Sequence, residues 1–79
     1  MEQRIRIPVC NRGATDLVVV VEPWASEICL RPGEVGEVIL IGDTGLPGHS
    51  IEFCPYGLIF WAEDGMDGFE LWRGDVQWG

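Results

Sequence analysis

The stretch LVVVVEPW, residues 17–24, joins a run of five apolar residues to Glu22, Pro23 and Trp24. β-Branched residues favour extended strands, whereas proline lacks the N–H that a β-ladder requires. The stretch therefore predicts a strand over residues 16–22 that ends abruptly before Pro23.

This strand carries apolar side chains on both faces, because successive side chains of a strand point to opposite sides. One face holds Leu17, Val19 and Val21, and the other holds Val18 and Val20. A strand with one face in water should alternate apolar and polar residues instead. Residues 38–41 and 58–61 repeat the pattern, so three strands are expected to need cover on both faces.

Short apolar stretches separated by turn residues continue along the whole chain, with no apolar spacing of helical period. The other predicted strands cover residues 4–10, 27–30, 35–41, 50–54, 58–62, 69–73 and 75–78. Their short connections favour antiparallel neighbours, because a parallel crossover needs about a dozen residues. The 79 residues therefore predict one all-β domain, a small antiparallel sandwich or barrel of six to eight short strands.

Two residues make sharper local predictions. Pro8 indicates that the strand over 4–10 lies at a sheet edge or is bulged there. The sequence RPGE, residues 31–34, predicts a type II turn with Gly33 at positive φ. Longer loops are expected over residues 42–49 and 63–68.

Charge restricts the possible partners. The chain has 13 acidic residues, five arginines and no lysine, which gives a formal net charge of −8. Nucleic acids and anionic membrane surfaces require clustered positive charge, so neither is an expected partner. No apolar run approaches the roughly 20 residues of a membrane span, and no apolar segment of a signal peptide follows the N-terminal arginines. We therefore expect a soluble protein of the cytoplasm.

The surplus of apolar faces has two possible explanations. Loops bearing tryptophans could cover the second face, or a partner, most simply a second copy of the chain, could do so. A small monomer whose tryptophans fill the core is the plainer alternative. Association predicts an interaction surface that contains Val18, Val20, Trp24, Trp72 and Trp78.

The cysteines favour neither a disulfide framework nor a zinc ribbon. There are three of them, an odd number, and no C-x-x-C motif. Strand alternation still leaves open a small ligand or metal site built from Cys29, His49, Glu52 and Cys54. Ordinary reduced thiols are the plainer interpretation.

No residue pattern predicts catalysis. His49 is the single histidine, and no serine has the G-x-S-x-G context of an activated nucleophile. No glycine-rich phosphate-binding loop is present, so no cofactor is predicted. The leading hypothesis is a non-enzymatic β-domain that acts through self-association or protein–protein interaction, with the small ligand or metal site as the alternative.

Residues 16–38 resemble a group of short uncharacterised bacterial proteins, in which an apolar strand ends in Glu-Pro-Trp and a Leu-x-Pro-Gly turn follows. The matching residues here are Leu17, Glu22, Pro23, Trp24, Leu30, Pro32 and Gly33. The resemblance covers under a third of the chain. It implies a free-standing β-domain of unknown activity and assigns no catalytic residue.

Overall fold

The computed structural model describes residues 2–42, 49–63 and 66–79. These residues form eight strands and no helix, which confirms the all-β prediction. The strands are β1 (Gln3–Cys10), β2 (Leu17–Glu22), β3 (Ser26–Leu30), β4 (Val35–Gly42), β5 (His49–Cys54), β6 (Gly57–Ala62), β7 (Met66–Arg73) and β8 (Val76–Gln77).

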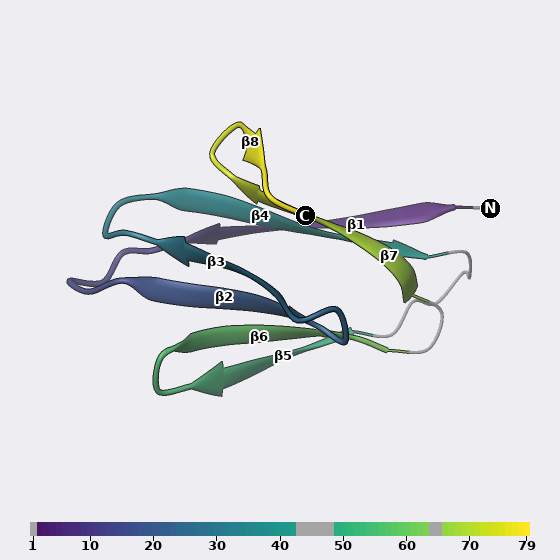
Figure 1. Ribbon diagram of the computed structural model, residues 1–79, viewed down its shortest axis with the longest axis horizontal. Coiled ribbons are helices and arrows are strands. Elements are labelled where there is room, and N and C mark those ends of the chain that lie inside the picture. Colours follow the sequence, from purple (N-terminus) through teal and green to yellow (C-terminus); the bar gives the residue numbers. More distant parts are fainter. Residues whose placement is uncertain (1, 43–48, 64–65) are drawn as a thin grey trace.

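The strands form two four-stranded sheets that pack as a small sandwich (Figure 1). Sheet A has the order β1-β4-β7-β8, and sheet B has the order β3-β2-β6-β5. Every pairing is antiparallel except that of β2 with β6, which is parallel. The exception arises because the chain leaves sheet B after β3, adds β4 to sheet A, and returns to sheet B at β5.

Five strands begin earlier than the sequence predicts: β1, β3, β5 and β6 by one residue, and β7 by three. Two of these starts lie in predicted loops. β5 begins at His49, which pairs with Ala62, and β7 begins at Met66, which pairs with Gly42. Cross-strand pairing thus extends both strands into segments whose composition indicates loops. The rest of the two predicted loops, residues 43–48 and 64–65, lies outside the described residues.

One hydrophobic core joins the two sheets. Its buried members are Val9, Val19, Val21, Ile28, Leu30, Val38, Leu40, Phe60 and Leu71. Val19 and Val21 are fully buried, and Leu17 packs against the same cluster, so the predicted inner face of β2 is confirmed. Val18 and Val20 point away from the core and are half-buried.

The local predictions for Pro8 and Gly33 are both confirmed. β1, which contains Pro8, is an edge strand of sheet A. Gly33 has a φ of 88°, and the Glu34 N–H donates to the Arg31 carbonyl at 3.0 Å, as a type II turn requires. The Gly33 N–H also donates to the Asn11 carbonyl at 2.7 Å, which ties this turn to the end of β1.

Replacing Gly33 by alanine should destabilise the fold by about 1 kcal/mol or more, because a Cβ is strained at this positive φ. In a domain of this size, that change lowers the Tm by about 4–8 °C. Gly68→Ala is the matched control, since a Cβ there meets Ile41 Cβ at an ordinary 3.7 Å. Thermal unfolding followed by circular dichroism tests the pair, and equal melting temperatures for Gly33→Ala and wild type would contradict the turn.

Aspartate at the two faces of β2 should have opposite outcomes. Val19→Asp places an unpaired charge in the fully buried core and should abolish folding. Val20→Asp places the same charge on the half-buried outer face and should leave a folded protein of lower stability. Far-ultraviolet circular dichroism of both variants measures this. A folded Val19→Asp protein would show that the assigned faces are wrong.

Candidate functional site

The outer face of sheet A has a cover made of its own side chains. Ile39 lies on this face, between Arg6 of β1 and Glu70 of β7, yet it is only 3% exposed. Arg4 forms an ion pair with Glu70 across the sheet. Arg6 forms a second ion pair, with Glu37, at 3.1 Å. The aliphatic parts of such long side chains cover apolar surface while their charged ends stay in water.

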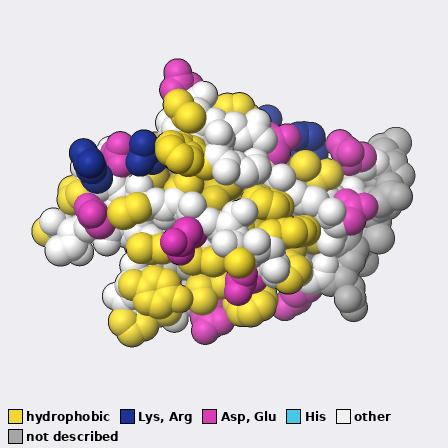
Figure 2. All heavy atoms as spheres, in the orientation of Figure 1, with side chains coloured by type: hydrophobic (Ala, Val, Ile, Leu, Met, Phe, Trp, Pro, Cys, Tyr) yellow, Lys and Arg dark blue, Asp and Glu magenta, His cyan; other side chains and the backbone are white. Residues whose placement is uncertain are grey.

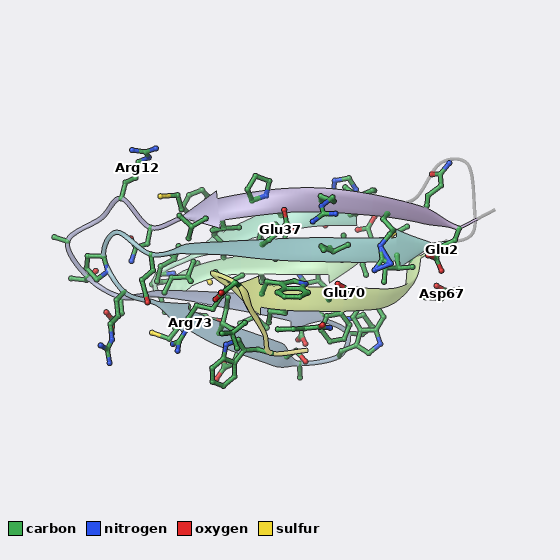
Figure 3. All side chains as sticks on the ribbon, turned by 90° about the horizontal axis from the view of Figure 1, so that it is seen from above. Glu2, Arg12, Glu37, Asp67, Glu70 and Arg73 are labelled. Carbon is green, nitrogen blue, oxygen red and sulfur yellow. The ribbon has the colours of Figure 1, made fainter. Side chains whose placement is uncertain are left out.

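Glu70 is bonded to two other side chains on this face of sheet A. It accepts the hydrogen bond of Arg4, and its second oxygen accepts the Trp72 Nε1–H at 3.0 Å. The Arg4 guanidinium and the Trp72 indole hold the pKa of Glu70 below its ordinary value. Seen from above, Glu37 and Glu70 lie over β4 and β7 (Figure 3). Sheet A therefore presents a polar surface of paired charges.

The outer face of sheet B has no comparable cover. Val18 and Val20 of β2 and Ile59 of β6 are half-buried there, and Trp61 is exposed. Trp61 donates its Nε1–H to Glu52 at 2.9 Å. Hydrophobic and acidic atoms occupy this side of the molecule in Figure 2, over β2, β6 and β5, whereas the arginine atoms lie nearer sheet A.

The two sheets also differ in charge. The strands of sheet B contain Glu22, Glu27 and Glu52 and no arginine. The strands of sheet A contain three acidic residues and three arginines, namely Glu37, Asp67, Glu70, Arg4, Arg6 and Arg73. In a chain with a net charge of −8, the strands of sheet B thus carry three glutamates and no arginine of their own, although Arg31 and Arg73 lie close enough to act on Cys29 at the β3 edge.

The apolar side chains of β5 that face the core side are uncovered. Ile51 is 50% exposed and Phe53 is 86% exposed. Their partners on β6 are Phe60, which is 1% exposed, and the half-buried Leu58. The core therefore ends at β6. β5 is the strand of sheet B that lies farthest from sheet A, and it extends past the core (Figure 1).

A groove of about 320 Å³ adjoins this exposed surface. Phe53 and Tyr56 line one side, and the segment between β1 and β2 lines the other. The Asn11 side chain holds that segment by donating to the carbonyls of Thr15 and Leu30 at 2.9 and 2.8 Å. Asp16 is the one charged residue among the described residues that line the groove.

Two ionisable side chains at or near the groove have raised pKa values. Cys54 raises the pKa of the Tyr56 phenol, so the phenolate is disfavoured. The nearby Cys29 thiol also has a raised pKa, through desolvation and then through the Asp16 carboxylate. Protonated thiols and phenols are poor nucleophiles.

The β5 edge is the least protected of the four sheet edges. β1 contains Pro8 and two arginines, and β8 is only two residues long, so both discourage strand pairing. β3 lies beside β7 of sheet A. β5 offers six residues with two exposed apolar side chains, and its proline, Pro55, comes only after the last of them. We define the β5 edge as Ile51, Phe53 and the outward backbone of β5.

The structure does not bring the five predicted surface residues together. Val18 and Val20 share the outer face of sheet B, as predicted. Trp24 instead stacks on Phe69 at the core, with ring centroids 4.6 Å apart. Trp72 lies over sheet A, and Trp78 lies 5.0 Å from the Arg73 guanidinium. The expected lid of tryptophans over Val18 and Val20 is therefore absent from the described residues.

The four residues of the alternative ligand or metal site are also separated. Cys29 lies on β3, and Cys54 lies on β5 at the opposite edge of sheet B. His49 and Glu52 point to opposite faces of β5, because their positions differ by three and successive side chains alternate between faces. The described residues hold no group of three or more potential metal ligands.

Sequence reasoning missed Ile51 and Phe53 as surface residues. Their alternation with Glu52 and Cys54 is typical of a strand with one buried face, so the pattern itself gives no sign that they are exposed. They are exposed because β5 is the edge strand of sheet B that lies farthest from sheet A (Figure 1).

Comparison with protein-family models, with curated proteins and with solved structures gave no match. The resemblance of residues 16–38 to short bacterial β-domains stays a prediction. None of the described residues belongs to a helix that could span a membrane.

The Glu70 ion pair should make stability depend on pH on the acid side. Because the folded state lowers the pKa of Glu70 from 4.5, its contribution is complete above that value. The contribution is lost as the pH falls through the folded-state pKa. Glu70→Gln should therefore lower the Tm at neutral pH, and the difference from wild type should shrink below about pH 4.5.

Asp67→Asn is the matched control, since it removes an exposed acid from the same strand. It should change the Tm less than Glu70→Gln at neutral pH. A Tm difference for Glu70→Gln that is constant from neutral to acid pH would show that the ion pair does not stabilise the fold.

Proposed function

We propose that the protein is a non-enzymatic interaction domain that binds another protein through the β5 edge. The observation that carries this proposal is the exposure of Ile51 and Phe53 at positions that face the core side of sheet B. We place its activity in the cytoplasm, because the three cysteines are free, two of them exposed.

Burial of these side chains would supply binding energy. Covering a large apolar side chain stabilises a complex by about 1.5–3 kcal/mol, and aromatic side chains dominate many interfaces. Phe53 contributes little to the core because most of its surface is already in water. Its apolar surface is therefore available to a partner.

The interaction can be tested by placing a photo-crosslinking phenylalanine analogue at position 53. Position 76 on β8 is the control, because Val76 is 51% exposed and apolar but lies on the other sheet. After irradiation of cells that produce the protein, position 53 should give a discrete crosslinked adduct several-fold more abundant than any at position 76.

Mass spectrometry of the adduct then identifies the partner as a second copy or as another protein. Adding Ile51→Ser should reduce the adduct, since it removes one of the two exposed apolar side chains of the β5 edge. Adducts of equal yield at both positions, or none at position 53, would contradict the function.

A further inference from the structure

We infer that the β5 edge accepts an extended segment of another protein, one that alternates apolar residues with lysine or arginine. The inference rests on the proposed function and specifies the chemistry of the partner. Its basis is the backbone of β5, which has no strand on its outer side among the described residues, together with the side chains on its two faces and the charge of the sheet B strands.

The backbone of β5 is ready to pair with an added strand. Cys54 and Gly57 flank the Pro55–Tyr56 turn and are opposite each other, so they form the hydrogen-bonded pair that closes the hairpin. Hydrogen-bonded and non-bonded pairs alternate along an antiparallel ladder. The N–H and C=O groups of Ile51 and Phe53 are thereby directed to the free edge, where a peptide strand can bind them.

The side chains on the two faces of β5 indicate which residue types the added strand would carry at alternate positions. On the core side, Ile51 and Phe53 favour apolar cross-strand neighbours. On the outer side, Glu52 favours a cationic neighbour, and Glu22 and Glu27 extend the acidic surface across the same face. A segment that alternates apolar and basic residues matches both faces.

The groove favours a basic residue at one end of the bound segment. This is the end that would lie beside the β5–β6 turn. The rings of Phe53 and Tyr56 and the Asp16 carboxylate line it. An alkylammonium or guanidinium group is attracted both to aromatic faces and to a carboxylate. No lining residue among those described carries a positive charge to oppose it.

Charge disfavours a second copy as the occupant. A second copy brings another net charge of −8 to the interface, and its β5 carries the same Glu52 and no arginine. Like charges brought together at an interface oppose association, whereas a basic segment is attracted. The chain's own Arg4 and Arg6 are already paired on sheet A.

The test uses three synthetic eight-residue peptides and isotope-labelled protein, followed by nuclear magnetic resonance. The first peptide alternates valine and lysine, the second replaces every lysine by glutamate, and the third is the first with alternate backbone nitrogens methylated. The lysine peptide should shift the amide signals of Ile51 and Phe53 and slow their hydrogen exchange. Glutamate replacement and N-methylation should each weaken binding by about tenfold or more, and added salt should weaken the lysine peptide.

Phe53→Ser tests the protein side, and this variant should fold because Phe53 is 86% exposed. It should weaken binding of the lysine peptide, whereas Val76→Ser should not. Equal binding of the lysine and glutamate peptides, shifts confined to other strands, or no binding of the lysine peptide would each overturn the inference. A dimer that sedimentation detects and Phe53→Ser abolishes would also overturn it in favour of a second copy. In each of these cases the crosslinking result decides separately whether the β5 edge is an interaction surface.

Discussion

The need to cover apolar residues on both faces of three strands shapes the whole structure. A sandwich of eight short strands has a single core, and only one face of each sheet can line it. The inner residues of β2, β4 and β6, among them the buried Val19, Leu40 and Phe60, line that core together with residues of β1, β3 and β7. Their outer residues must be covered by something other than the second sheet.

Sheets A and B meet this need differently. On sheet A, the ion-paired side chains of Arg4 and Arg6 cover Ile39. Charged side chains therefore do what an additional strand or loop would otherwise do. On sheet B, the outer positions around Val20 and Ile59 carry glutamates without arginines. Because the arginines of the strands all lie on sheet A, the cover cannot be repeated, and sheet B stays both apolar and acidic.

The sequence was sufficient for features that depend on local geometry. The alternation around Val19, the edge position of β1 and the positive φ of Gly33 all follow from one residue or one short pattern, and all three are confirmed. Features that depend on strand order could not be predicted from the sequence. Neither the parallel pairing of β2 with β6 nor the position of β5 beyond sheet A has a local signal, because each results from connections between the sheets. For the same reason the tryptophans were assigned to one surface, although the fold separates them.

The exposure of Phe53 bears on why this side chain is present. A phenylalanine that is 86% exposed gains little from the hydrophobic effect within the chain, and in water it favours aggregation at a strand edge. A serine at the same position would retain the backbone pairing with Leu58 and remove that hazard. Burial within the fold therefore does not account for an aromatic residue there. The proposed contact with a second molecule would account for it, since the same surface that costs solubility in the free chain would stabilise a complex once it is covered.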